Sequence, residues 1–191
     1  MVKLIAQHPL SEALPKKIGS VSFTAHHPDK ITSIAPYEGQ GKAVSDALNA
    51  ALLMRFPSPN RALQSQAGRL IWAGKGVALL FDADVPDIAN LAATTDQSDA
   101  WAIVRIDGPQ TEDILARLVP IDLAKPAFKV GHTARTMVGH MTGTVTRIGP
   151  QAFEIMVMRS MASTLLHDLT RAAKGVAARV AGEATQGEAG E

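Results

Sequence analysis

Apolar residues recur in short runs and at helical spacing through the first half of the chain, and they predict a succession of elements. The run ITSIAP (31–36) is typical of a strand. From Gly41 to Phe56 the apolar residues fall at helical spacing, and this stretch predicts a helix. Two apolar runs on either side of residues 74–76, RLIWA and VALLF, predict a hairpin. A short helix is expected over residues 86–91.

The second half repeats this order of elements. AWAIVRI (100–106) is apolar on both faces, which predicts a central strand. GPQTEDILARLV (108–119) predicts a helix with acidic residues near the positive end of its dipole. The runs 132–148 and 152–158 predict a second, longer hairpin. A final helix is expected to begin at Ser160, as its N-cap residue, and to end near residue 180.

The order strand, helix, hairpin, helix therefore occurs twice, and it predicts an α+β fold with two related halves in a single domain over residues 31–180. Residues 1–30 contain three prolines and no clear periodicity, so we expect an irregular N-terminal arm that lies across its own domain or across a partner. Residues 181–191 are rich in Gly and Glu and have no large apolar side chain. We expect them to form a disordered acidic tail.

Composition narrows the class of protein. The 191 residues carry a formal net charge of +1, with scattered basic residues and few aromatic ones, so neither nucleic acid nor a membrane is expected as a partner. The absence of cysteine excludes disulfides and thiolate metal sites. No apolar run approaches the roughly 18 residues that span a bilayer, and no secretory signal is recognisable at the start. We therefore expect a cytoplasmic protein.

Motifs for common chemistry are missing. The glycines at 74 and 76 lack the spacing of a phosphate-binding or dinucleotide-binding loop. His26 and His27 are adjacent, so an extended backbone points them to opposite sides, and the other histidines are scattered. No serine has the flanking glycines of a nucleophile elbow. We expect no catalytic, cofactor-binding or metal-binding residue in this chain.

The stretch DQSDAWAIVRIDGP (96–109) concentrates charge beside the predicted central strand, at Asp96, Asp99, Arg105 and Asp107. A catalytic acid–base cluster is one interpretation. The favoured one is structural: aspartates beside turn residues bond to the backbone, and Arg105 pairs with one of these carboxylates because an unpaired charge in a strand is costly.

Two blocks carry a resemblance to a known family across roughly residues 30–170. One is the D-x-S-D-x-W strand with its GP helix start, and the other runs through H-M, R-x-G and F-E-I-x-V-x-R-S-x-A. The second block contains Met141, Arg147, Phe153, Arg159 and Ser160. Together they resemble the gamma subunit of heterotetrameric sarcosine oxidases, a family similar to the folate-binding domain of the aminomethyltransferases (T-proteins).

The resemblance implies a place in a complex with alpha, beta and delta subunits. Complexes of that family demethylate sarcosine oxidatively to glycine, reduce oxygen to peroxide, and pass a one-carbon unit to tetrahydrofolate. The resemblance implies that FAD, FMN, NAD and tetrahydrofolate serve the complex, and that this chain alone binds none of them.

One departure from the related aminomethyltransferases concerns an acidic pair that serves their folate and amine chemistry. The matching positions fall near Met141 and Thr142, and neither side chain can act as a general base. This favours a non-catalytic structural subunit. The alternatives are a stand-alone folate-binding one-carbon transfer protein and an iron–sulfur or tRNA-modification factor, whose usual cysteine signature this chain lacks.

Overall fold

The computed structural model describes residues 7–188, with the side chains of residues 7–183. No helix in this part of the chain is long and apolar enough to cross a membrane. The strands are β1 (Lys16–Ile18), β2 (Val21–His26), β3 (Ile31–Pro36), β4 (Ala62–Ser65), β5 (Gly68–Gly74), β6 (Val77–Phe81), β7 (Ala92–Asp96), β8 (Trp101–Asp107), β9 (Thr133–Val138), β10 (Met141–Arg147) and β11 (Ala152–Met158). The helices are α1 (Gly41–Leu52), α2 (Thr111–Leu115), the 3-10 turn η1 (Arg159–Met161) and α3 (Ala162–Glu188).

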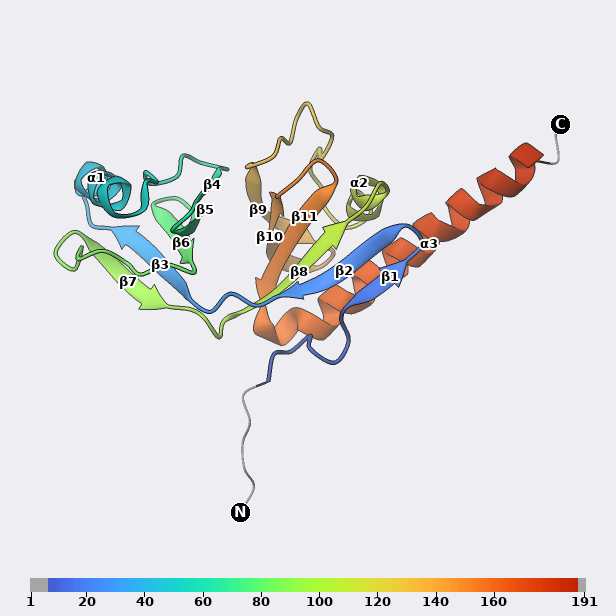
Figure 1. Cartoon of the computed structure of the whole chain (residues 1–191), viewed down its shortest axis with the longest axis horizontal. Helices are drawn as coiled ribbons and strands as arrows, with labels where there is room; N and C mark the ends of the chain where they lie inside the picture. Colours follow the sequence, from blue (N-terminus) through green and yellow to red (C-terminus); the bar gives the residue numbers. More distant parts are fainter. Residues whose placement is uncertain (1–6, 189–191) are drawn as a thin grey trace, which may run out of the picture.

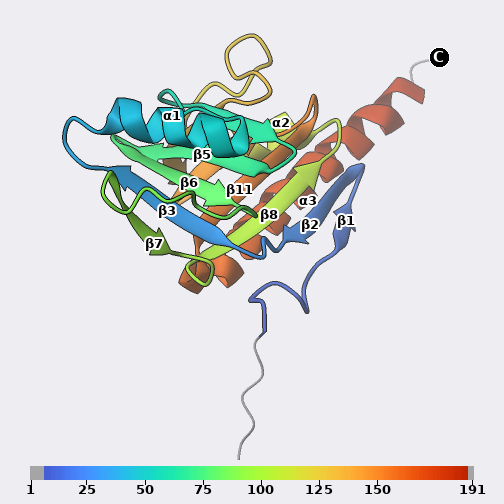
Figure 2. The same ribbon diagram turned by 60° about the vertical axis from the view of Figure 1, so that its left-hand side comes forward.

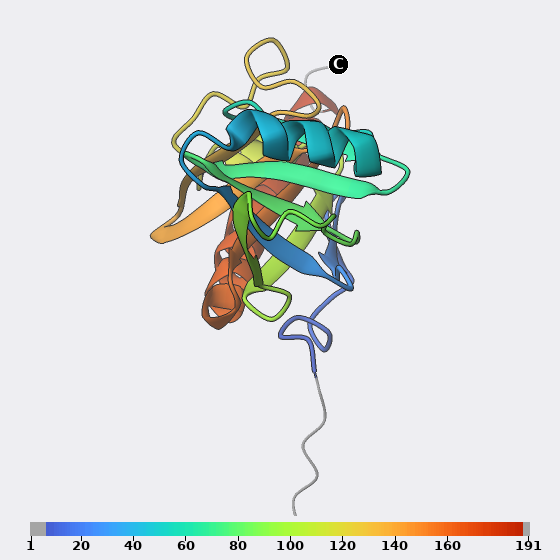
Figure 3. The same cartoon turned by 90° about the vertical axis from the view of Figure 1, so that its left-hand side faces the viewer.

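The strands form two antiparallel sheets that lie between helices. The six-stranded sheet has the order β1-β2-β8-β11-β10-β9, and the five-stranded sheet has the order β4-β5-β6-β3-β7. α1 covers the outer face of the five-stranded sheet, while α2 and α3 lie on the outer side of the six-stranded sheet (Figures 1 and 2). Viewed from the α1 side, the helix lies in front of both sheets (Figure 3). The α+β class is confirmed.

Alternation along the strands explains these layers. In β8, Ala102, Val104 and Ile106 join the core beneath α2 and α3, whereas Ile103 joins a second apolar cluster between the sheets. That cluster also contains Ile31, Ile71, Leu79, Phe81 and Met156. Because both faces of β8 are buried, its continuous apolar run is explained, and its predicted central position is confirmed.

Along the chain, each sheet is built from one strand, followed by a helix and then by three further strands. β3, α1 and β4 to β6 in one sheet correspond in order to β8, α2 and β9 to β11 in the other. The helix predicted over 86–91 is wrong, since this segment is a turn that buries Ile88. The long strand predicted over 132–148 is two strands, because Gly139 adopts a φ of 58° and turns the chain. The relation between the halves stays a prediction.

The irregular arm predicted over residues 1–30 is wrong for residues 16–26, which form β1 and β2. β2 pairs with β8 over five residue pairs, and Phe23 is buried in the core beneath α3. Leu10 and Leu14 reach the same core, so the segment from Leu10 lies on its own domain. Residues 1–6 fall outside the described part of the chain.

The disordered tail predicted over 181–191 is wrong for residues 181–188, because α3 continues to Glu188 and extends past the sheets (Figure 1). Residues 189–191 fall outside the described part. Ser160 is not an N-cap: it lies inside η1, whose N-cap position is Met158 with no side-chain hydrogen bond.

A charge cluster joins the two sheets in the space between them. Glu154 of β11, only 3% exposed, accepts hydrogen bonds from Arg69 of β5 in the opposite sheet and from Nε of Arg105 at 3.0 Å. Nδ1 of His26 lies 2.8 Å from the same carboxylate, and Nη2 of Arg105 lies 2.9 Å from Nε2 of His26. A guanidinium can only donate, so Nε2 of His26 accepts and the ring proton sits on Nδ1.

These partners decide the ionisation of Glu154. Burial by itself raises the pKa of this carboxyl. The hydrogen bond from His26 and the charge of Arg69 outweigh burial and lower the pKa from 4.5 to about 2. The carboxylate is therefore charged at neutral pH, and its oxygens are occupied by groups from both sheets.

We predict that Glu154→Gln lowers the free energy of unfolding by about 3 kcal/mol, because it leaves the buried guanidinium of Arg69 without its counter-charge. Urea denaturation followed by circular dichroism measures the change. Asp113→Asn is the control. It removes an exposed carboxylate 3.4 Å from Arg179 and should cost less than about 1 kcal/mol. Equal losses in the two variants would contradict the bridging role of Glu154.

The low pKa of Glu154 also predicts a dependence of stability on pH. Its contribution is fully present above the unfolded-state pKa of 4.5 and is lost as the pH falls toward the folded-state value of about 2. The difference in unfolding free energy between wild type and Glu154→Gln should therefore narrow within this window. Denaturation curves at a series of pH values test this, and a constant difference would argue against it.

Candidate functional site

The charged residues singled out in the sequence do not form one cluster. Asp96 accepts hydrogen bonds from the backbone N–H and the hydroxyl of Ser98 at 2.9 and 2.6 Å, and these bonds lower its pKa. Asp99 is fully exposed, with Nη1 of Arg159 3.8 Å away. Asp107 is exposed at the end of β8. They occupy separate positions at the two ends of β8.

The predicted pairing of Arg105 with one of these aspartates is wrong. Arg105 pairs with Glu154, which lies directly opposite it in the ladder of β8 and β11. The two residues are 49 positions apart in the sequence. Only the register of the sheet reveals this contact, since the nearer carboxylates look equally suitable along the chain.

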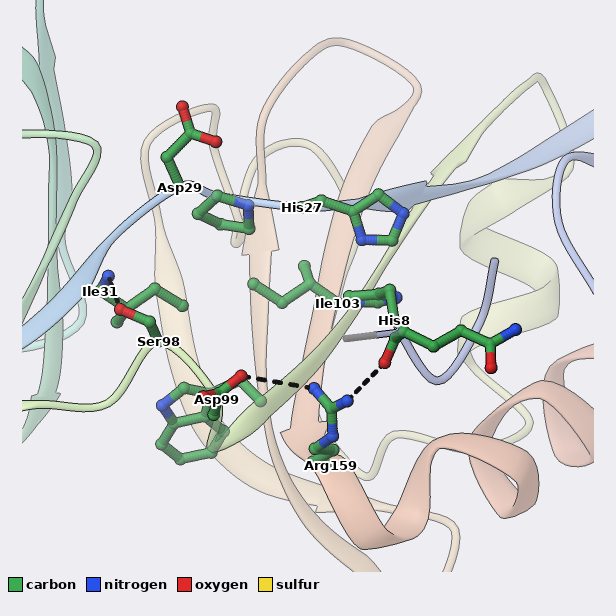
Figure 4. A pocket seen from close by; sticks show the side chains of 11 residues that line it. His8, His27, Asp29, Ile31, Ser98, Asp99, Ile103 and Arg159 are labelled. Atoms are coloured by element: carbon green, nitrogen blue, oxygen red, sulfur yellow. Dashed lines mark hydrogen bonds and ion pairs between the residues drawn. The ribbon is translucent and has the colours of Figure 1, made fainter. Parts of the chain in front are cut away.

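A cavity of about 540 Å³ opens where the chain crosses between the sheets. Residues 27–30 lead from β2 to β3, and residues 97–100 lead back from β7 to β8. Ser98 ties the crossings together, because its hydroxyl accepts a hydrogen bond from the backbone N–H of Ile31 at 3.1 Å. Both crossing segments line the cavity (Figure 4).

Seven polar residues from distant parts of the chain line the cavity: Gln7, His8, His27, Asp29, Ser98, Asp99 and Arg159. Arg159, at the start of η1, donates to the backbone carbonyl of Gln7 at 2.6 Å. The rings of His8 and His27 meet edge to face, with 3.5 Å between their centroids. Figure 4 shows Arg159 on one side of the cavity, close to Asp99, and the two histidines on another.

The rest of the lining is apolar. It is formed by Pro28, Ile31, Trp101 and Ile103. The volume and the mixed lining are typical of sites that bind a small molecule or a side chain.

The two histidines are neutral at neutral pH. Burial, followed by the nearby His27 and Arg159, lowers the pKa of His8 from 6.5 to about 4. Burial and the proximity of His26 lower the pKa of His27 in the same way. Arg159 is thus the cation beside the cavity, and each imidazole offers one donor and one acceptor nitrogen.

No group of three or more His, Cys, Asp or Glu side chains that could hold a metal ion occurs in the described part of the chain. Met141, at a position where related aminomethyltransferases are expected to carry a carboxylate, packs into the core beneath α3. Thr142 is exposed and has its hydroxyl 4.0 Å from the sulfur of Met137.

Sequence reasoning missed this cavity. His8, His27 and Arg159 have no spacing that connects them, and they meet only because the first segment folds against η1. Among these three residues only Arg159 carried a signal, as part of the second resemblance block, while Ser98, Asp99 and Trp101 of the lining belong to the first block. Two other members of that block, Arg147 and Phe153, are buried, with the guanidinium 4.3 Å from the ring centre.

Arg147 connects α2 to the segment that follows it and to the turn between β10 and β11. It donates to the carbonyls of Pro150 and Leu123, and its guanidinium lies 2.8 Å from the carboxylate of Glu112. This arginine is therefore a structural residue that anchors the segment between α2 and β9.

Comparisons with solved structures give the same fold. A chain of heterotetrameric sarcosine oxidase from Corynebacterium sp. U-96, solved in complex with pyrrole 2-carboxylate, matches with a TM-score of 0.75 and 17% identity. The match covers 90% of this chain and 96% of that chain. The glycine cleavage system aminomethyltransferase T from Bartonella henselae matches with a TM-score of 0.55 and 15% identity, over 80% of this chain and 46% of that one.

A comparison with curated protein sequences gave no match. A comparison with protein families gave one match. The matched region includes β8, the crossing segment 97–100 and the whole six-stranded sheet except β1 and β2. The matched residues are 72–188, more than half of the chain, and the protein therefore belongs to the GCVT N-terminal domain family.

Proposed function

We propose that this chain is a non-catalytic structural subunit of a sarcosine oxidase complex. The observation that carries the proposal is the match to a chain of heterotetrameric sarcosine oxidase over nearly the full length of both chains. The aminomethyltransferase, in contrast, is matched over less than half of its own length. A whole-chain match favours an equivalent place in an assembly over a role as one part of a transferase.

The positions of Met141 and Thr142 support a non-catalytic role. Met141 is 5% exposed and contributes to the core, so a carboxylate there would be buried without a partner. Thr142 faces solvent, and the contact of its hydroxyl is with the sulfur of Met137, which is no general base. Neither residue supplies the acid–base chemistry of a one-carbon transfer.

We propose that the described side chains of residues 7–183 do not hold tetrahydrofolate. The aminopyrimidine edge of a pterin presents adjacent N–H donors, which a carboxylate satisfies best in a buried site. Glu154 is the one buried carboxylate among the described side chains, and its oxygens are already occupied by Arg69, Arg105 and His26. We therefore assign tetrahydrofolate, FAD, FMN and NAD to the other chains of the complex.

The proposed partners are the alpha, beta and delta subunits, and the proposed location of the complex is the cytoplasm. In this assembly the substrate is sarcosine, which the flavin-bearing subunits oxidise. The chain described here contributes a rigid two-sheet body held together by its buried charge cluster.

We expect the isolated chain to produce no peroxide from sarcosine, and the complex co-expressed with its alpha, beta and delta subunits to produce it. A peroxidase-coupled assay at equal chain concentration measures both. Omission of this chain should reduce the yield of intact complex, seen by size-exclusion chromatography. Sarcosine-dependent peroxide from the isolated chain would overturn the proposal.

We also expect isothermal titration of the isolated chain with a reduced folate to give no saturable heat. The titration of the complete complex provides the positive control. Tight binding by the isolated chain would favour the alternative of a stand-alone folate-binding transfer protein.

A further inference from the structure

A partly exposed surface of mixed polar and apolar character lies between two hollows at the start of β8. We define the Trp101 surface as Trp101, Met158, Arg159 and the loop 96–100. The cavity of about 540 Å³ lies on one side, and a second hollow of about 680 Å³, lined by this loop and Met158, lies on the other. Ser98, Asp99 and Trp101 line both hollows.

The register of the sheet explains why Trp101 is only half-buried and Met158 is exposed. Trp101 and Met158 lie directly opposite each other in the ladder of β8 and β11, on the face that packs against the other sheet. Further along the same strands, Ile103 and Met156 are buried in the cluster between the sheets. Trp101 packs against the edge of that cluster, while Met158 is 50% exposed. The core between the sheets thus continues to the molecular surface here.

Trp, Met and Arg are the residue types enriched at the centres of protein interfaces, and here one of each lies around two hollows. Leu53 is a useful contrast. It is 81% exposed at the left-handed C-cap of α1, but it lines neither hollow. Exposure alone therefore does not distinguish the Trp101 surface; its distinction from Leu53 is that Trp101 and Met158 line the two hollows together with charged residues.

Charge around this surface selects the partner. Asp29, Asp96 and Asp99 are exposed at the rims of the hollows, and hydrogen bonds from Ser98 keep Asp96 ionised. Two cations offset part of this charge. Arg159 lies 3.8 Å from Asp99 and donates to a backbone carbonyl, and Lys30 acts on Asp96 but is paired with Asp84 at 2.7 Å. The two neighbouring histidines are neutral, so a negative excess remains. A basic partner is complementary to it.

We propose that the Trp101 surface docks a basic segment of a partner subunit in the complex. A Lys or Arg of that segment pairs with Asp99, and a neighbouring apolar side chain packs between Trp101 and Met158. This inference rests on the proposed function, because it assigns the surface through which the subunit joins its assembly. It also gives the D-x-S-D-x-W stretch, with its two exposed aspartates, a role in assembly instead of acid–base chemistry.

The test measures the affinity between the separately prepared chain and a complex of the other subunits, which are co-expressed and purified without this chain. Asp99→Lys reverses a fully exposed charge and should leave the folded chain intact. We expect this substitution to raise the dissociation constant about tenfold or more. Met158→Ala should raise it as well. Raising the salt concentration should weaken wild-type binding and reduce the difference between wild type and Asp99→Lys.

Matched controls come from the same chain. Asp87→Lys reverses an exposed charge in the turn that precedes β7, and Leu53→Ala truncates a more exposed apolar side chain. Both should bind as wild type does. Fluorine NMR of the chain labelled with fluorotryptophan, in a Trp72→Phe background, leaves Trp101 as its sole tryptophan, and its signal should shift on assembly.

The outcomes separate the two proposals. A wild-type chain that fails to assemble with the other subunits overturns the proposed function. A wild-type chain that assembles, with Asp99→Lys and Met158→Ala binding equally well, overturns only the Trp101 surface. Self-association of the isolated chain that Asp99→Lys abolishes assigns the surface to a second copy and overturns the choice of a basic partner subunit.

Discussion

The buried carboxylate of Glu154 holds together the two sheets on which every other feature depends. It belongs to one sheet, accepts from an arginine of the other, and also meets Arg105 and His26 from strands of its own sheet. Burial of such a charge is tolerated only when its partners are in place, so the cluster favours one arrangement of the sheets over others. Burial of the apolar cluster beside it stabilises the packing of the two sheets but is not directional, whereas the charged groups specify which strands face each other.

The two crossings between the sheets lie near one end of this interface, and the candidate site is built there. Each crossing must leave one sheet and enter the other, so its backbone cannot be covered by regular strand pairing. Ser98 satisfies part of that backbone, and a cavity remains beside Arg159, His8 and His27. A surface of this kind suits an assembly, because it is concave, partly apolar and held by a rigid body.

The residues that mark the family divide between two tasks. Arg147 and Phe153 are buried and hold the segment after α2, while Trp101 and Arg159 reach the surface beside the hollows. A motif match by itself does not separate these tasks, because the same block contains both. Their burial in the folded chain does, and it directs the proposed interaction to the start of β8.

Local patterning was sufficient to predict β3, α1, the hairpin of β5 and β6, β8 and most of α3, because apolar spacing and turn residues act over a few positions. It did not predict the strands at residues 16–26, since their stability comes from pairing with β8 far along the chain. It also gave Arg105 the wrong partner, because the choice among carboxylates was made by sheet register. The sequence by itself determined the element types, the family resemblance and the absence of cysteine chemistry. Only the tertiary structure decided that Glu154 joins the sheets and that Arg159 meets His8 and His27, because those contacts form between segments that no local spacing connects.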